Sequence, residues 1–403
     1  MYYTLLITFL IALLSASCSN PTPNTQVADN EEENMTEIVK PGSWQTGDYL
    51  PLVENKKIGM VVNHTSRIGE MHLVDSLLKL NIKIQRIFSP EHGFRGKADA
   101  GAHIGDETDP ETGIPIVSLY GEKRKPSESD IKYLDLLIFD IQDVGARFYT
   151  YISTLHYVME ACAEFQKPLI VLDRPNPNGH YMDGPVRQDS FQSFVGMHPV
   201  PVVYGMTIGE YAQMINGEKW LTDGLQCELQ VIKCKNYNHQ TMYELPVAPS
   251  PNLPNLRSVL LYPSLCFFEG TPISIGRGTN TQFQVIGHPD LQGDYAFVPE
   301  PMFGAAKPKL EGKQCKGLDL TKLSVEDIFA TSEIQLKFIL DAYAQFPDKK
   351  KFFNANGWFD RLAGTTTLRE QIINGKSEEE IRNTWQPDLV NFAEKRLKYL
   401  LYP

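Results

Sequence analysis

The fold is indicated first by Ile82-Lys83-Ile84-Gln85-Arg86-Ile87-Phe88-Ser89-Pro90-Glu91-His92-Gly93-Phe94-Arg95-Gly96, in which a strand-like run leads directly into a polar loop. Charged side chains at the end of a buried strand must be either solvated or used by a site. Glu91, His92 and Arg95 therefore mark a candidate site. The alternative is a salt bridge between Glu91 and Arg95 at the base of the loop.

Three other apolar runs repeat this arrangement along the chain. Ile58–Val62, Leu136–Phe139 and Leu169–Leu172 are predicted strands, and apolar residues at helical spacing predict helices at Met71–Leu80 and Tyr151–Phe165. Near-continuous apolar strands that alternate with helices are typical of a parallel sheet covered on both faces. The sequence therefore predicts an α/β fold.

Polar residues follow each of the four predicted strands. In open parallel sheets, ligands bind beyond the carboxyl ends of the strands. Such residues also cap helices and shape turns, and this is the alternative for any single cluster. Four clusters on one edge of a sheet predict a polar binding site, and its candidate residues are Asn63, His64, Glu91, His92, Arg95, Asp140, Gln142, Asp143, Asp173, Arg174 and Asn176.

The length of 403 residues suggests two domains. We expect a parallel-sheet domain at residues 44–245 and a smaller α/β domain at residues 246–403. The proline-rich passage Pro246–Pro263 is interpreted as an ordered linker between them. In the smaller domain, helices are predicted at Val325–Tyr343 and Glu378–Tyr399. This domain is expected to close over the edge of the sheet.

The N-terminal residues resemble the export signal of a bacterial lipoprotein. Residues 1–17 contain an uncharged apolar run that is short for a membrane span, so we expect a signal peptide that is removed. Small residues lead to Cys18, the expected site of lipid attachment, and the polar residues 18–43 are predicted to be a solvated tether. The expected location is the cell envelope, at its periplasmic or outer-membrane face. Plain cleavage and secretion is the alternative.

Charge and cysteine content exclude several classes of protein. The formal net charge is -11 and no basic stripe is present, which argues against a nucleic-acid partner. Five cysteines besides Cys18 occur at irregular spacings and rule out a complete disulfide framework. A single bridge remains open at this stage, with Cys227 and Cys234 as the nearest pair.

Familiar cofactor motifs are missing from the sequence. There is no GxGxxG after the first strand, no phosphate loop, no GxSxG and no HExxH, so we expect no cofactor. A scattered set of His and Asp residues is common around parallel sheets that hold no ion, so no metal is expected either. A metal site is the alternative, and its ligands would be His64, His92, Asp140 and Asp173.

The remaining residues are carboxylates beside amides and arginines, which suit a polyhydroxylated or acidic ligand. Glycoside hydrolysis needs a carboxylic acid to protonate the leaving oxygen, and usually a second carboxylate. Glu91 is the candidate acid, and Asp140, Asp143 and Glu269 are candidates for the second role.

Arginines offer a way to hold an acidic ligand at the same place. An acidic substituent on the ligand is expected to bind one guanidinium bidentately, and the candidates are Arg147, Arg174 and Arg277. Tyr149 is interpreted as a packing or sugar-stacking residue.

Four ordered blocks of the sequence resemble the signature of a known family. They are Ser89 to Gly96, Asp140 to Tyr151, Leu172 to Gly179, and Glu269-Gly270-Thr271 with Gly276-Arg277-Gly278-Thr279. In these blocks the chain is similar to the exo-β-N-acetylmuramidase family, long described as a domain of unknown function, and the resemblance extends from Lys57 to the C-terminus. It implies a Rossmann-like catalytic domain with a second, smaller α/β domain, and it places the catalytic glutamate at Glu91. Pro272 and Ile275 differ from residues that are frequent in the family, a variation that concerns substrate detail and not the reaction.

The resemblance implies a glycoside hydrolase that releases N-acetylmuramic acid from the non-reducing ends of peptidoglycan fragments. The lactyl carboxylate of this sugar would occupy an arginine, and its acetamide offers an internal nucleophile in place of a second carboxylate. The alternatives are a non-catalytic, lipid-anchored muropeptide-binding receptor and a metal-dependent cell-wall hydrolase. Oligomeric state and the choice between retention and inversion are left open.

Overall fold

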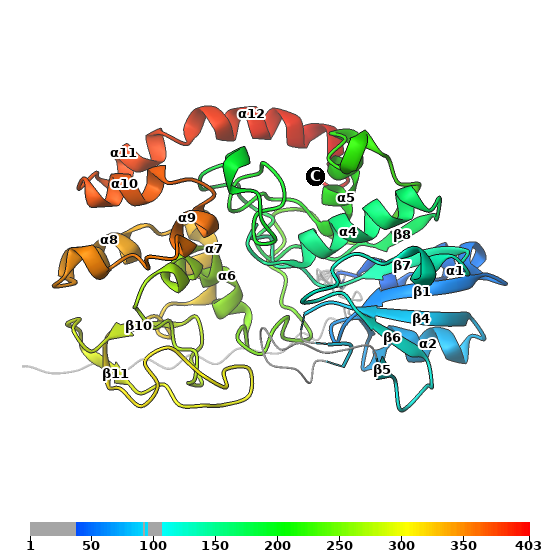
Figure 1. Cartoon of the computed structure of the whole chain (residues 1–403), viewed down its shortest axis with the longest axis horizontal. Helices are drawn as coiled ribbons and strands as arrows, with labels where there is room; N and C mark the ends of the chain where they lie inside the picture. Colours follow the sequence, from blue (N-terminus) through cyan, green and yellow to red (C-terminus); the bar gives the residue numbers. More distant parts are fainter. Residues whose placement is uncertain (1–37, 92, 96–106) are drawn as a thin grey trace, which may run out of the picture. The chain divides into compact units, whose positions relative to one another are not determined.

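The computed structural model describes residues 38–91, 93–95 and 107–403. Its largest sheet has seven strands in the order β5-β6-β4-β1-β7-β8-β9 (Figure 1). Neighbouring strands are parallel except at the edge, where β5 is antiparallel to β6. The strands are β1 (Lys57–Val62), β4 (Lys83–Ser89), β5 (Glu107–Thr108), β6 (Pro115–Ser118), β7 (Leu136–Asp140), β8 (Leu169–Leu172) and β9 (Leu229–Ile232).

The strand order confirms the predicted fold class. Apart from the edge strand β5, the six parallel strands occur in the chain order 3-2-1-4-5-6, which is that of the Rossmann fold. The four strands predicted from the sequence are β4, β1, β7 and β8, and they are consecutive neighbours in the sheet. Their carboxyl ends therefore share one edge, as expected.

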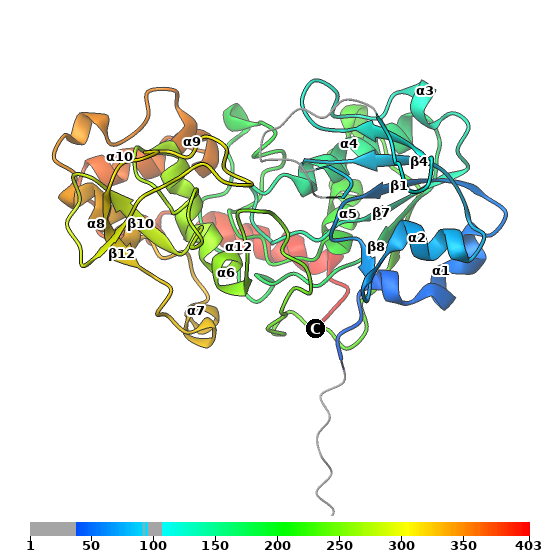
Figure 2. The ribbon, with the colours of Figure 1, turned by 90° about the horizontal axis from the view of Figure 1, so that it is seen from below.

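Two helical layers cover the faces of this sheet, as Figure 2 shows for α1, α2, α4 and α5. Alternate residues of each strand enter different cores: Met60 and Ile138 pack with α1 (Thr46–Val53) and α2 (Leu73–Lys79). Val61 and Phe139 pack with α4 (Tyr151–Glu164) and α5 (Ile208–Gly217) on the other side. Burial on both faces explains why these strands are apolar at nearly every position. This half also contains a two-stranded ribbon, β2 (Arg67–Ile68) and β3 (Met71–His72), and helix α3 (Glu128–Ile131).

The C-terminal part of the chain forms a second, smaller region. It contains a three-stranded antiparallel sheet in the order β10-β12-β11 and seven helices. The strands are β10 (Val285–His288), β11 (Tyr295–Phe297) and β12 (Cys315–Asp319). The helices are α6 (Leu256–Leu265), α7 (Val325–Thr331), α8 (Lys337–Gln345), α9 (Trp358–Ala363), α10 (Thr367–Ile373), α11 (Glu378–Asn383) and α12 (Gln386–Arg396).

Three predicted segments of this region differ from the structure. Half of the expected linker is helix α6, which begins after Asn255 because this residue and Ser258 form a capping box. The helix predicted at Val325–Tyr343 is two helices, since Ser332 adopts a left-handed conformation with φ 50° and ends α7. The predicted helix Glu378–Tyr399 divides into α11 and α12, with a proline in the first turn of α12.

The C-terminus returns to the parallel-sheet region, and α12 (red in Figure 1) leads it there. The Tyr399 hydroxyl donates to Glu218 at 2.8 Å, and the Tyr402 hydroxyl donates to Asp173 at 2.6 Å. The backbone N–H of Leu401 donates to Glu210 at 2.7 Å. The last residues of the chain are thus part of the first region's polar core.

The predicted tether ends earlier than expected. Lys40 pairs with Lys235 through backbone hydrogen bonds of 3.0 and 2.9 Å, and the Gly42 N–H donates to the Asp173 carbonyl at 2.7 Å. Residues 40–43 therefore pack on the folded region. The predicted signal peptide at residues 1–17, Cys18 and the tether up to residue 37 lie outside the described residues.

Cysteine state is also settled for the described chain. The five described cysteines are free and buried, and they are Cys162, Cys227, Cys234, Cys266 and Cys315. The structure therefore lacks the Cys227–Cys234 bridge that the sequence left open. None of the helices formed by the described residues is both long and apolar enough to cross a membrane.

Candidate active site

A cavity of about 800 Å³ lies beyond the carboxyl ends of the parallel strands. Glu91 follows β4, Tyr120 follows β6 and Thr150 precedes α4, whereas Glu269 and Arg277 come from the C-terminal region. A second cavity of about 80 Å³ shares Glu91 and Arg277 with the first. Both halves of the chain therefore contribute to one site.

Glu91 is placed in the cavity by a tight turn after β4. Gly93 adopts φ +78°, and its N–H donates to the Pro90 carbonyl at 3.2 Å. The Thr150 hydroxyl donates to Glu91 Oε2 at 3.4 Å. Burial and the neighbouring Glu91 carboxylate raise the pKa of Tyr120, so that this phenol stays protonated beside the acid. The carboxyl group thus has two hydroxyl neighbours that help to fix its position.

Glu269 and Arg277 form a partly exposed ion pair in the cavity wall. Arg277 Nε lies 2.6 Å from Glu269 Oε1, and their side chains are 29% and 23% exposed. Although burial raises the pKa of Glu269, Arg277 and Lys309 lower it below its ordinary value. Gly278 places Arg277, because a Cβ at its φ of +81° would lie 2.7 Å from a backbone oxygen. Glu269 is therefore held as a carboxylate that faces the cavity.

Asp140 and Arg174 form a second ion pair, which is closed to solvent. Arg174 donates from Nε to Oδ1 at 2.5 Å and from Nη2 to Oδ2 at 2.8 Å. Their side chains are 0% and 3% exposed, and neither residue lines either cavity. Each carboxylate oxygen is taken by the guanidinium, so the pair ties the ends of β7 and β8 together. This geometry gives the two residues a structural role, and the catalytic and substrate-binding roles predicted from the sequence find no support in their placement.

Asp143 and Gln142 shape the turn after β7. Asp143 Oδ2 accepts from the Gly145 N–H at 2.7 Å and from the Tyr204 hydroxyl. Burial raises the pKa of Asp143 to about 6 even though these hydrogen bonds lower it. The Gln142 side chain donates to two backbone carbonyls, those of Asp143 and Pro175, at 2.9 and 2.7 Å. Neither side chain lines a cavity, so the predicted catalytic role of Asp143 and the predicted binding role of Gln142 find no support in their placement.

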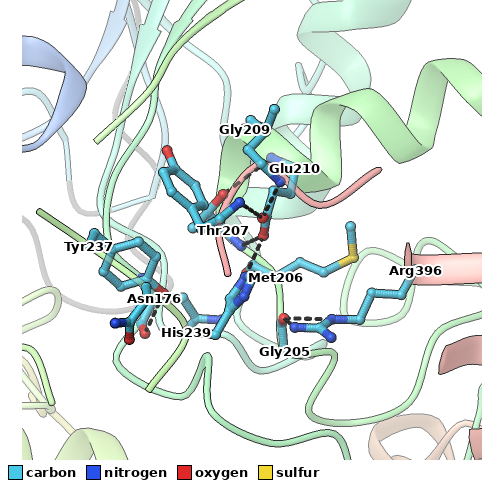
Figure 3. A network of polar contacts seen from close by, with 12 residues as sticks. Asn176, Gly205, Met206, Thr207, Gly209, Glu210, Tyr237, His239 and Arg396 are labelled. Atoms are coloured by element: carbon cyan, nitrogen blue, oxygen red, sulfur yellow. Dashed lines mark hydrogen bonds and ion pairs between the residues drawn. The ribbon is translucent and has the colours of Figure 1, made fainter. Parts of the chain in front are cut away.

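Asp173 and Asn176 anchor the returning C-terminus and the start of α5. Asp173 accepts from Thr207, from the Gly209 N–H and from Tyr402 at 2.6 to 2.8 Å. Burial raises the pKa of Asp173 to about 6. Asn176 donates to the Met206 carbonyl at 2.8 Å and lies beside Tyr237 (Figure 3). Both residues serve the scaffold beside the cavity.

Glu210 is the centre of the network drawn in Figure 3. Its Oε2 accepts from the Thr207 N–H at 2.9 Å, which completes a capping box at the start of α5, and it lies 2.9 Å from His239 Nε2. Nearby, the Arg396 guanidinium donates to the Gly205 carbonyl at 2.8 Å. The polar residues around the β8 exit therefore join the two ends of the fold instead of opening to a ligand.

The remaining predicted residues after β1 and β4 are engaged within the protein. Asn63 is buried, accepts from the Thr65 N–H at 2.9 Å and donates to the Tyr151 hydroxyl at 2.9 Å. His64 Nε2 lies 2.9 Å from the Ala248 carbonyl. Neither Asn63 nor His64 lines a cavity.

Arg95 lies at the base of the loop after β4, where it binds acidic residues of the protein. It donates to both oxygens of Asp109 at 3.0 and 2.9 Å, and it lies 3.5 Å from Asp75 and 3.2 Å from Glu111. Its predicted contact with substrate therefore finds no support in its placement. His92 lies outside the described residues.

Arg147 has a different role from the one predicted. It is fully buried and donates to four backbone carbonyls, those of Pro185, Val200, Leu362 and Ala363, at 2.7 to 2.9 Å. Leu362 and Ala363 end helix α9, so Arg147 holds this helix of the second region against the first. The predicted role of Arg147 as a substrate-binding guanidinium therefore finds no support in its placement, because both of its Nη groups donate to backbone carbonyls.

Tyr149 lies in the smaller cavity, where its role is packing. Its hydroxyl donates to the Pro249 carbonyl at 2.7 Å, and its ring packs edge-on against Tyr151 and Tyr262 at 4.9 and 5.7 Å. The packing interpretation of the sequence agrees with this arrangement.

Several cavity residues were not predicted from the sequence. Tyr120 and Arg124 follow β6, a four-residue strand that was not recognised. Trp358 and Arg361 belong to α9, which reaches the cavity only through tertiary packing. The only sequence feature that could have indicated them is an aromatic residue and a cation one helical turn apart in α9, and this pair belongs to no known motif.

The described residues contain no group of three or more His, Cys, Asp or Glu side chains placed to hold a metal ion. Three of the four candidate ligands lie in different environments, and the fourth, His92, is outside the described residues. Asp140 is bound by Arg174, Asp173 by hydroxyl and backbone donors, and His64 contacts a backbone carbonyl.

Comparison with known proteins identifies the family. Residues 58–257 match the N-terminal part of "Exo-beta-N-acetylmuramidase NamZ", and residues 260–402 match its C-terminal part. The chain belongs to the NamZ exo-beta-N-acetylmuramidase family. It is thus a glycosidase of that family, and the resemblance of its sequence blocks is confirmed. The predicted domain boundary at residue 245 stays a prediction.

Relatives of known sequence and structure support this membership of the NamZ family. The chain is 37% identical to "Peptidoglycan beta-N-acetylmuramidase NamZ" of Bacillus subtilis (strain 168), over 98% of this chain and 99% of that protein. A crystal structure of a DUF1343 family protein from Bacteroides fragilis NCTC 9343 has 48% identity and a TM-score of 0.84, and covers 91% of this chain and 99% of its own. A second DUF1343 protein from that strain has 29% identity and a TM-score of 0.79, with the same coverage.

Proposed function

We propose that this protein releases N-acetylmuramic acid from the non-reducing ends of peptidoglycan fragments, with Glu91 as the general acid. The observation that carries the proposal is the position of Glu91 in a cavity of about 800 Å³ lined by both regions of the chain. The name of the Bacillus subtilis relative supports peptidoglycan as the substrate. The cavity volume lies within the range of ligand sites for small molecules.

Glu91 in its protonated form would donate to the glycosidic oxygen as the bond to the anomeric carbon breaks. The hydroxyl of Thr150 and the phenol of Tyr120 hold the carboxyl in place. Because the phenol stays protonated, it can also donate a hydrogen bond when Glu91 has lost its proton. These contacts support a role in which Glu91 alternates between acid and conjugate base.

Glu269 is the carboxylate in the cavity that best fits the second role. Arg277 and Lys309 keep it ionised, as a group that stabilises positive charge at the anomeric carbon must be. The acetamide of the substrate is the other candidate, and it would attack the anomeric carbon from within the sugar. Asp140 and Asp143 do not line the cavity, so we leave them out of the mechanism.

The test is release of free N-acetylmuramic acid from a disaccharide in which this sugar is the non-reducing end. Glu91→Gln keeps the size and hydrogen-bonding capacity of the side chain but removes the proton donor. We expect kcat to fall by roughly 10²- to 10⁴-fold. Glu128→Gln, a surface substitution in α3 outside the cavity lining, serves as the matched control and should keep full activity.

Full activity of Glu91→Gln would exclude Glu91 as the acid. If the wild-type protein bound muramyl sugars and released none, the receptor alternative would replace the enzyme. Loss of activity on adding a chelator would instead favour the metal-dependent hydrolase.

For the location, we propose lipid attachment at Cys18 and residence in the cell envelope. The support is the apolar N-terminal run and the small residues before Cys18. Mass spectrometry of the N-terminal peptide from the membrane fraction would test this proposal. Recovery of wild-type protein in the soluble fraction with an unmodified cysteine would contradict it.

A further inference from the structure

The arginines predicted to contact the substrate are already engaged by protein atoms. Arg95, Arg174 and Arg277 pair with carboxylates, and Arg147 donates to backbone carbonyls. Arg277 lines the cavity, but its charge is already balanced by Glu269, so an anionic sugar is better recognised by cations that have no acidic partner.

Arg124 is one cation of the cavity lining that is not engaged in this way. Its sequence neighbours Lys123 and Lys125 are drawn into ion pairs with carboxylates of α3 and α4 at 2.7 and 2.9 Å. Within the described residues, Arg124 itself has no ion-pair partner. Its guanidinium carbon lies 4.5 Å from the centre of the Phe194 ring, which also lines the cavity. A guanidinium on an aromatic face keeps its edge N–H groups available to a ligand.

Arg361 is the corresponding cation from the C-terminal region of the chain. The adjacent carboxylate, Asp360, is bound by Arg369 at 2.8 Å, and over the described ranges Arg361 has no ion pair. Its guanidinium carbon lies 5.7 Å from the centre of the Trp358 ring. Arg361 thus repeats the arrangement of Arg124, with an arginine at an aromatic residue in the cavity wall.

The charge balance of the cavity also favours an anionic ligand. The Glu269–Arg277 pair is neutral as a unit, and a general acid at Glu91 must be protonated to act. The remaining charged residues of the described lining are Glu122, Arg124 and Arg361. With Glu91 protonated, the net charge of the described lining is therefore +1.

We propose that Arg124 and Arg361 bind the lactyl carboxylate of the muramyl residue and thereby select it over sugars that lack this group. The inference rests on the proposed function, since it names the substituent that the Glu91 cavity recognises. Arginine presents paired N–H donors that match the two oxygens of a carboxylate. One arginine comes from each region of the chain, so the substituent is bound only when both regions are in place.

The test compares two substrates that differ at one group. They are an aryl β-glycoside of N-acetylmuramic acid with a free lactyl carboxylate, and its lactyl methyl ester. In Arg124→Gln and Arg361→Gln we expect kcat/KM for the free acid to fall by roughly ten- to a hundredfold, as for loss of a hydrogen bond to a charged group. The values for the ester should stay close to those of the wild type.

Arg86→Gln is the matched control, because it removes the same charge from a β4 side chain that pairs with Asp130 outside the cavity lining. It should leave both substrates unaffected. Unchanged cleavage of the free acid by both cavity variants, or an equal loss on the ester, would overturn the proposal.

Failure of the proposed function would be seen separately. If the wild-type protein cleaved neither glycoside, calorimetry with free N-acetylmuramic acid and N-acetylglucosamine would still report on the two arginines. Weaker binding of only the acidic sugar in the variants would support carboxylate recognition. Equal binding of both sugars by the wild type would reject it.

Discussion

The protein contains two acid–arginine pairs that the sequence presents in the same way, and the structure separates them. Asp140–Arg174 is 0% and 3% exposed and joins two strand ends, whereas Glu269–Arg277 is 23% and 29% exposed and lines the cavity. Both acids lie in sequence blocks typical of the family. Depth, and not residue type, decides which pair meets a ligand.

The difference has an energetic side. A buried ion pair that loses one partner leaves a charge without compensation, and this is strongly destabilising. In a partly exposed pair, water can solvate the residue that remains after its partner is replaced, so the substitution costs little folding free energy. The comparison therefore predicts that replacing the arginine by glutamine mainly lowers stability in the buried pair and mainly lowers activity in the pair that lines the cavity.

The largest effect is expected for Arg174→Gln. It leaves the Asp140 carboxylate at 0% exposure without its bidentate partner. We expect the free energy of unfolding to fall by about 3–5 kcal/mol. Urea denaturation followed by circular dichroism measures this change. A loss below about 1 kcal/mol would show that the pair is hydrated and would remove the contrast with Glu269–Arg277.

A pH effect of intermediate size is expected at Asp143, a buried carboxylate without an arginine. Its pKa is raised to about 6 by burial, and among the described residues its Oδ1 has no hydrogen-bond partner. As the pH falls from about 6 toward the unfolded value of about 4, the folded state takes up a proton that the unfolded chain does not bind, so stability rises.

Asp143→Asn removes this titration. At pH 4 relative to pH 7, the variant should therefore lack a stabilisation of roughly 1–3 kcal/mol that the wild type gains from this proton. Asp173, whose pKa is also raised to about 6, should maintain part of the rise in both proteins. Denaturation curves at several pH values provide the measurement, and identical slopes for variant and wild type would contradict it.

The smallest effect on stability is expected for Arg277→Gln. Because the Glu269 carboxylate is 23% exposed, we expect a change of about 0–1 kcal/mol in unfolding free energy. Activity should respond more strongly, with kcat lowered by roughly tenfold or more, since one of the two charges that keep Glu269 ionised is gone. A variant that is fully active but clearly unstable would reverse the assignment of the two pairs.

The strand exits show how far sequence reasoning reaches. Runs such as Leu136–Phe139 indicated the parallel sheet, because a strand buried on both faces is apolar at nearly every position. Glu91 was found for the same reason, since an acid directly after such a run has few structural uses. The placement of these strand ends at one edge of the sheet was thus predictable from local pattern.

Which side chains at that edge are buried and which reach the cavity was not predictable. Arg147 and Arg277 look alike in sequence, but Arg147 is used by the carbonyls that end α9, a helix more than two hundred positions away. Arg361 reaches the cavity because α9 packs closely on Gly270, where a Cβ would lie 2.5 Å from the Phe359 backbone. Such contacts depend on distant segments, and no local spacing records them.

Asp173 binds residues from both ends of the folded chain, Gly42 through its carbonyl and Tyr402 through its carboxylate. Gly42 and Tyr402, which lie near the two ends of the described chain, therefore meet at the end of β8. A circular permutation that joins residue 403 to residue 38 through a short linker and opens an exposed turn elsewhere should keep the cavity intact. Extensions at the C-terminus, by contrast, would lie next to Tyr402, whose hydroxyl donates to Asp173.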